Sequence, residues 1–134
     1  IDKGTELKNL NLSWWGQSHL VDCRALTSLP ERLGECEALQ TLNLGCCSAL
    51  TSLLEQLGEC EALKTLHLGG CEALTSLPER LGECKALQTL DLLYCDALTS
   101  LPDLSGLEQL KVGYLPNHLK PWQDSGYKAF SVAS

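Results

Sequence analysis

The 134-residue chain has no methionine, a single phenylalanine and few aromatic residues of any kind. A compact globular core normally uses these large side chains, so a core built almost wholly from leucine and alanine indicates one packing solution used many times. No stretch approaches the roughly 18 apolar residues that a membrane-spanning helix needs. The start of the chain lacks the basic and apolar regions of a secretory signal, and without an initiator methionine we expect a piece of a longer protein.

Positive charge is also scarce, with 10 lysines and arginines against 17 acidic residues and a formal net charge of -7. Nucleic acids and anionic lipids are bound largely through lysine and arginine. We therefore expect neither a nucleic-acid partner nor a membrane partner. The same negative charge favours solubility, and we expect a monomer.

Leucine is abundant, and it recurs with a period of 24 residues. The consecutive blocks 29–52, 53–76 and 77–100 agree at most positions, which identifies an internal repeat. Each block contains the pattern L-x-x-L-x-L-x-x-C-x-x-L-x-x-L. Its first copy is formed by Leu39, Leu42, Leu44, Cys47, Leu50 and Leu53, and the next two copies follow at the same spacing.

The two halves of the repeat predict different local structures. Alternating residues in x-Leu-x-Leu face opposite sides of a short strand, with leucine inward. Pro30 and Pro78 begin a second half that favours a short helix or 3₁₀ turn. Ordering one repeat costs about 1–2 kcal/mol per residue, while each buried leucine returns only about 1.5–3 kcal/mol. A repeat must therefore stack on its neighbours, with strands about 4.8 Å apart.

This pattern is that of leucine-rich repeats. Over roughly residues 5–112, it resembles the repeats of plant nucleotide-binding immune receptors and of algal and protist multidomain proteins. The resemblance implies an α/β right-handed solenoid, with short parallel β-strands on the concave face and 3₁₀ or short helical turns on the convex face. It also implies a protein-binding recognition module of a larger intracellular signalling or immune-receptor-like protein. The convex face would be acidic, and we interpret it as solvated: Glu31, Glu35, Glu37, Glu55, Glu59, Glu61, Glu79 and Glu83.

We predict a single domain over residues 1–134, of which residues 1–28 form the first repeat. Its strand is expected at 7–12, followed by an eight-residue insertion before Cys23. A second register would place the strand at Trp15, Ser18 and Leu20, and we prefer the insertion. Trp14 and Trp15 would either bind a partner or cover the N-terminal edge of the core, and the two interpretations have equal weight.

Regular repeats are predicted over 29–112, with a last strand formed by Leu107, Leu110 and Val112. Residues 113–134 leave the pattern and are rich in aromatic side chains. We interpret them as a C-terminal cap that contains a short helix or turn near 117–130. A flexible, partner-binding tail is the alternative.

Seven of the eight cysteines follow the repeat. One series is Cys23, Cys47, Cys71 and Cys95, and the other is Cys36, Cys60 and Cys84. Parallel columns of thiols neither bridge one another readily nor converge on a metal ion. We expect reduced thiols that act as small, weakly donating core residues, with no metal and no cofactor. Reduced thiols favour a reducing compartment, so the predicted location is cytoplasmic.

Only three columns hold three different residues across the repeats: Asn43/His67/Asp91, Cys46/Gly70/Tyr94 and Ser48/Glu72/Asp96. Since otherwise near-identical copies differ mainly on one surface, we predict that the concave face and its rim recognise the partner. Leu93 and Tyr94 would be exposed apolar side chains there. Ordinary drift on a solvated sheet is the alternative. The candidate residues are Asn11, Trp14, Asn43, Cys46, His67, Asp91, Leu93, Tyr94, Lys111 and Tyr114.

Cys46, His67 and Asp91 fall on three successive repeats and would be a conceivable nucleophile, base and orienting group. A flat open sheet, however, offers no pocket and no oxyanion donors. We therefore predict that the chain is not an enzyme and that it binds a protein or peptide ligand. The rival function is a structural spacer or an autoinhibitory surface that packs on its parent chain, and a cysteine-based enzyme is the remote alternative.

Overall fold

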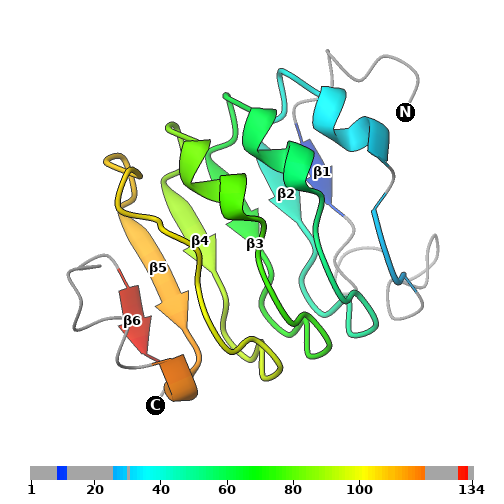
Figure 1. Cartoon of the computed structure of the whole chain (residues 1–134), viewed down its shortest axis with the longest axis vertical. Coiled ribbons are helices and arrows are strands. Elements are labelled where there is room, and N and C mark those ends of the chain that lie inside the picture. Colours follow the sequence, from blue (N-terminus) through cyan, green and yellow to red (C-terminus); the bar gives the residue numbers. More distant parts are fainter. Residues whose placement is uncertain (1–8, 12–25, 30, 120–129, 133–134) are drawn as a thin grey trace.

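The computed structural model describes residues 9–11, 26–29, 31–119 and 130–132. Its strands lie in chain order in one open sheet, and each pairs in parallel with the next (Figure 1). The 3₁₀ helices η4, η5 and η6 form a second layer over this sheet. The strands are β1 (Asn9–Asn11), β2 (Thr41–Asn43), β3 (Thr65–His67), β4 (Thr89–Asp91), β5 (Val112–Leu115) and β6 (Phe130–Val132). The 3₁₀ helices are η4 (Glu31–Glu35), η5 (Glu55–Glu59), η6 (Glu79–Glu83) and η7 (Asn117–Leu119).

Leucines fill the space between the two layers. In β2, β3 and β4 the middle leucine is buried and its two neighbours are half-buried, as the alternation of a strand requires. Leu39, Leu42, Leu44 and Leu50 are all completely buried, as are their counterparts in the next two repeats. The predicted α/β architecture of short parallel strands and 3₁₀ turns around a leucine core is confirmed.

The repeat cysteines that the structure describes are buried at the inward positions that the sequence predicts, and Cys23 lies outside the described residues. The thiols of Cys71 and Cys95 donate to backbone carbonyls of the preceding repeat, 27 residues earlier, at 3.2 and 3.1 Å. Cys60 and Cys84 make the same kind of contact on the 3₁₀ side, at 3.9 and 3.4 Å. Each of these thiols therefore fills a core position and also ties its repeat to the one before.

Thiol labelling tests this arrangement directly. Cys60, Cys71, Cys84 and Cys95 are buried free thiols, whereas Cys46 is partly exposed. In the folded protein we expect Ellman's reagent to modify Cys46 and to reach the four buried thiols only after denaturant is added, because a thiolate must contact the reagent to react. Peptide mapping by mass spectrometry assigns each modified residue. Labelling of the buried thiols at the rate of Cys46 would contradict the core placement.

The pairing of β1 decides between the two registers of the first repeat. Asn9 pairs with Thr41, an offset of 32 residues, which is the 24-residue period plus eight. The insertion register is therefore confirmed for β1. Trp14 and Trp15, together with the competing strand residues, lie outside the described part of the chain.

The prediction for the last regular strand was wrong. β5 begins at Val112, and Leu90 pairs with Gly113 rather than with Leu110. A glycine therefore stands where earlier repeats have an inward leucine, so the leucine spacing alone misplaced the strand. Lys111 consequently precedes the strand, where its N–H donates to the carbonyl of Gln88 at 2.8 Å. β5 also crosses the predicted boundary at 112/113, and the capping role of residues 113–134 stays a prediction.

Candidate functional site

One row of outward residues crosses the sheet at the third position of strands β2, β3, β4 and β5. Asn43, His67, Asp91 and Tyr114 face one another in register, and the backbone of Asn11 continues this row in β1. The first three side chains are half-buried, while Tyr114 is exposed. We call this set, Asn43, His67, Asp91 and Tyr114, the central row. It contains four of the predicted contact residues, and the parallel pairing brings them together.

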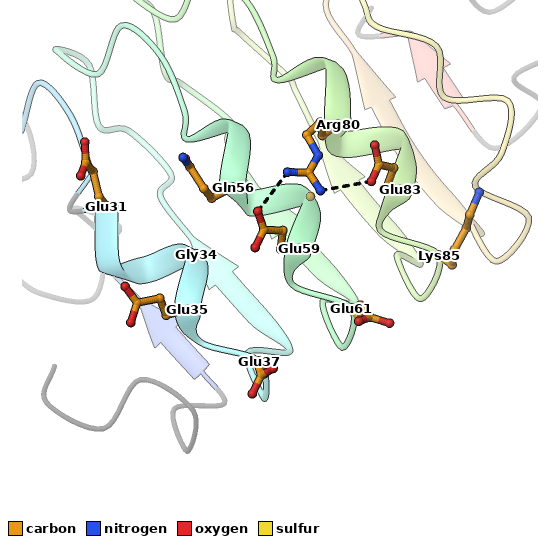
Figure 2. Close-up of a pocket in the computed structure, with 11 residues that line it drawn as sticks. Glu31, Gly34, Glu35, Glu37, Gln56, Glu59, Glu61, Arg80, Glu83 and Lys85 are labelled. Carbon is orange, nitrogen blue, oxygen red and sulfur yellow. Dashed lines mark hydrogen bonds and ion pairs between the residues drawn. The ribbon is translucent and has the colours of Figure 1, made fainter.

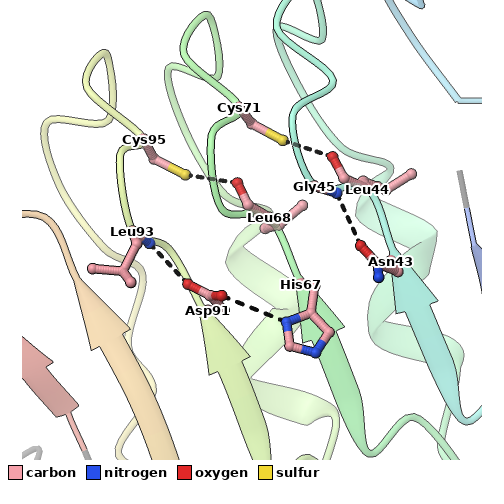
Figure 3. A network of polar contacts seen from close by, with 9 residues as sticks. All are labelled: Asn43, Leu44, Gly45, His67, Leu68, Cys71, Asp91, Leu93 and Cys95. Atoms are coloured by element: carbon pink, nitrogen blue, oxygen red, sulfur yellow. Dashed lines mark hydrogen bonds and ion pairs between the residues drawn. The ribbon is translucent and has the colours of Figure 1, made fainter. Parts of the chain in front are cut away.

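The central row contains a polar pair. His67 Nδ1 lies 3.5 Å from Asp91 Oδ2, and both side chains are partly accessible to solvent (Figure 3). A partly exposed pair of this kind adds little to stability. Its chemical value is that a carboxylate and an imidazole stand side by side on an open surface, where the carboxylate can accept a hydrogen bond from a partner and the imidazole can donate or accept one.

A second row lies just beyond the strands, and its backbone is unusual. Cys46 and Tyr94 have a φ of 63° and Gly70 a φ of 83°, all in the left-handed region. We call these three residues the turn row.

Tyr94 is 61% exposed and Tyr114 37%, and they are the exposed large hydrophobic residues of the described chain. Predicted exposure is thus confirmed for Tyr94, but Leu93 is only half-exposed.

Two of the central-row side chains shape the turns that follow them. Asn43 Oδ1 accepts a hydrogen bond from the N–H of Gly45, and Asp91 Oδ1 accepts one from the N–H of Leu93, both at 3.0 Å (Figure 3). Such Asx contacts stabilise a turn locally. Turn chemistry is therefore a cause of the sequence variation in this column besides recognition and drift, the two causes that the sequence alone suggested.

The geometry gives no support to a catalytic Cys–His–Asp arrangement. Within the described residues, no hydrogen bond joins Cys46 to His67, and Cys46 Sγ instead lies over Gly70, 3.1 Å from where a Cβ would be. Nor do the described residues contain a group of three or more His, Cys, Asp or Glu side chains placed to hold a metal ion. What the site offers chemically is recognition: aromatic surface beside hydrogen-bonding groups.

A shallow acidic depression lies on the opposite face, over the 3₁₀ helices (Figure 2). Arg80 bridges it, with its guanidinium 3.0 Å from Glu59 and 3.4 Å from Glu83. The described glutamates of this face are exposed, as the sequence predicted, but the hollow itself was not predicted. The depression is lined by Glu31, Gly34, Glu35, Glu37, Gln56, Gly58, Glu59, Glu61, Arg80, Glu83 and Lys85.

Glycines let the 3₁₀ helices approach one another beneath this depression. A Cβ on Gly58 would lie 2.4 Å from the carbonyl oxygen of Arg80, and one on Gly82 would lie 2.4 Å from that of Asp103. A Cβ on Gly34 would lie 2.5 Å from the Cβ of Gln56 and 3.3 Å from its carbonyl oxygen. The sequence does contain a feature that could have predicted this close packing. Gly34, Gly58 and Gly82 occupy the same position of the three repeats, and a repeated glycine is typical of close backbone approach.

This architecture is similar to that of a solved structure. The structure of a leucine-rich-repeat protein from Leptospira interrogans matches 87% of this chain with a TM-score of 0.54 and 26% sequence identity. The chain has a leucine-rich-repeat fold. It spans 38% of the length of the Leptospira protein's chain. No protein-family model and no curated protein match the chain.

The likeness supports the leucine-rich-repeat family, which generally mediates protein binding, and it leaves the finer resemblance to plant immune receptors as a prediction. No helix among the described residues of this leucine-rich-repeat chain is long and apolar enough to cross a membrane.

Proposed function

We propose that this leucine-rich-repeat chain binds a protein or peptide through the sheet face, using the central row and the turn row. The observation that carries the proposal is the pair of exposed tyrosines, Tyr94 and Tyr114, on the same face as the His67–Asp91 pair. Tyrosine provides a large contact area with a polar tip, and it is enriched at the energetic centres of protein interfaces. Polar groups beside it supply orientation.

The chain would serve as the recognition part of a larger signalling or immune-receptor-like protein in the cytoplasm. The buried thiols of Cys71 and Cys95 support a reducing location, since each is held as a thiol that donates a hydrogen bond to a backbone carbonyl. The predicted monomer, the lack of a nucleic-acid partner and the lack of catalysis belong to the same proposal. Six glutamates line the depression on the 3₁₀ face, which makes that surface unfavourable for phosphate groups.

Peptide selection tests the proposal without a known partner. A random peptide library displayed on phage is panned on the immobilised chain, and the dissociation constants of the selected peptides are measured by fluorescence anisotropy. We expect Tyr94→Gly and Tyr114→Thr each to weaken binding by about tenfold or more, because each removes exposed aromatic area. The stability of the Tyr94→Gly variant should not fall, since glycine accepts the φ of 63° at this position.

A matched control lies on the other face. Glu61→Gln removes an exposed charge from the acidic depression and should leave peptide affinity unchanged. If Glu61→Gln reduced binding while both tyrosine variants bound normally, the sheet face would not be the recognition surface. If no selected peptide depended on either face, a structural spacer or a self-packing surface would replace the proposed function.

A further inference from the structure

The turns that leave β2, β3 and β4 share one backbone geometry. In each, the N–H of the inward cysteine donates to the carbonyl of the leucine three residues earlier, at 3.1, 3.0 and 3.2 Å for Cys47, Cys71 and Cys95. The residue before that cysteine has a positive φ in every case. This is the third position of a type II turn, where glycine is the usual residue because an L side chain is strained there.

Only one of the three turns has glycine at this left-handed position. The turn after β3 has Gly70, but the other two have Cys46 and Tyr94 at the same left-handed position. The turns with Cys46 and Tyr94 also share a feature that the turn after β3 lacks. Each follows an Asn or Asp whose side-chain oxygen accepts the N–H of the second turn residue, whereas Gly70 follows His67. The side-chain acceptor and the non-glycine residue therefore occur together.

Core packing does not account for the tyrosine in this strained position. The Tyr94 side chain is 61% exposed, so burial of its ring offsets little of the backbone strain. Strained residues that are kept despite their cost are found at sites of ligand contact. The simplest account is that the turn holds Tyr94 where a partner meets it.

We infer that Asp91 is a positioning residue, which holds the turn that presents Tyr94 on the sheet face, and that Asn43 does the same for Cys46. This inference rests on the proposed function, because the presented side chains are the contact residues. Asp91 acts through the N–H of Leu93, at 3.0 Å, rather than through its charge. An acceptor oxygen at this position is the requirement, and the asparagine of the β2 turn shows that an amide meets it equally well.

The first test measures the backbone conformation of residue 94 and needs no binding partner. Residual dipolar couplings and backbone chemical shifts report the φ of residue 94 in the wild type, in Asp91→Ala and in Asp91→Asn. We expect the alanine variant to leave the left-handed region and the asparagine variant to keep it. A positive φ that persists in Asp91→Ala would overturn the positioning role.

The second test uses a peptide selected on the wild-type chain as the probe. Asp91→Ala should weaken its binding by about tenfold, whereas Asp91→Asn should cost only about threefold, because it keeps the acceptor for the Leu93 N–H and loses only the charge beside His67. Equal losses in the two variants would mean that the carboxylate itself contacts the peptide, which overturns the inference. Failure of Tyr94→Gly to affect the peptide would instead count against the proposed function.

A repeat-swap variant provides an independent check on stability. Asp91→His alone copies His67 into the β4 turn but leaves Tyr94 unsupported, so its melting temperature should fall by about 4 °C. Adding Tyr94→Gly completes the copy of the His67/Gly70 turn and should recover most of that loss. If the double variant melted at the same temperature as Asp91→His, the two positions would be uncoupled and the inference would be wrong.

Discussion

Gly58→Ala is expected to lower the free energy of unfolding by about 3 kcal/mol, because the packed 3₁₀ layer has no room for an added methyl group at this position. The new Cβ would lie 2.4 Å from the carbonyl oxygen of Arg80 and 2.6 Å from its Cβ. Because the obstructing carbonyl is backbone, η5 and η6 would have to separate, and the thiol contact from Cys84 to Leu57 would lengthen with them. Urea unfolding followed by circular dichroism measures the change.

Gly69→Ala is the matched control. Its Cβ would meet only the tip of the Asp91 side chain, at 3.3 Å, and its φ is outside the left-handed region. Since alanine also restricts the unfolded chain, the variant should be within about 0.5 kcal/mol of the wild type or slightly more stable. A Gly58→Ala variant as stable as Gly69→Ala would show that the 3₁₀ layer is not closely packed.

The free energy of unfolding should fall as the pH rises above 9, because the buried thiols have a raised pKa. Burial, reinforced by the neighbouring thiol of each series, raises the pKa of Cys71 and Cys84 to about 12. Burial likewise raises the pKa of Cys95 to about 12 and that of Cys60 to about 11. These thiols therefore keep their protons in the folded state at a pH where an unfolded thiol, with an ordinary pKa of 9.0, has lost its own.

The sign of the effect follows from this difference. Because the folded pKa values are raised, the stabilisation is complete below pH 9 and is lost as the pH rises toward 11–12. Each thiol should contribute a decline of about 1.4 kcal/mol per pH unit within that interval. Urea unfolding at a series of pH values from 8 to 11, with a phosphine reductant present, measures the decline.

A variant that lacks two of the buried cysteines separates the contribution of the thiols to the pH dependence from that of other groups. The double variant Cys71→Ala, Cys95→Ala is less stable at neutral pH, because it loses two buried side chains and their hydrogen bonds. Its stability should nevertheless decline more gently above pH 9 than that of the wild type, since two of the buried thiols with a raised pKa are gone. Parallel curves would show that the buried thiols do not titrate on unfolding.

The regular part of the fold could be predicted from the sequence because every repeat meets the same physical constraints. Inward leucines at alternate positions define the strands, and the 24-residue spacing of the cysteines predicts a shared inward position in parallel columns. The register of β1 was also predictable, since the interval from Asn9 to Thr41 shows the insertion as an excess of eight residues. Periodicity is informative wherever a residue has a counterpart in the next repeat.

The failures occur where a residue has no such counterpart or serves two purposes. Gly113 replaces an inward leucine of the last repeat, so the hydrophobic pattern placed the final strand too early. Variation at Asn43, His67 and Asp91 suggested recognition or drift but not a role in the following turn, because side-chain hydrogen bonds to the backbone leave no mark in the repeat pattern. The hollow on the 3₁₀ face likewise depends on how closely the backbones approach at Gly58.

The thiol contacts also bear on how such a chain can change in length. Each described donor reaches a carbonyl 27 residues earlier, and β2, β3 and β4 pair at intervals of 24. A 24-residue unit could therefore be duplicated or deleted within residues 29–100 without creating a new kind of contact, because the junction would repeat an existing one. An insertion of another length would change the interval between paired strands, as it does between β1 and β2, where Asn9 pairs with Thr41 at an interval of 32 residues.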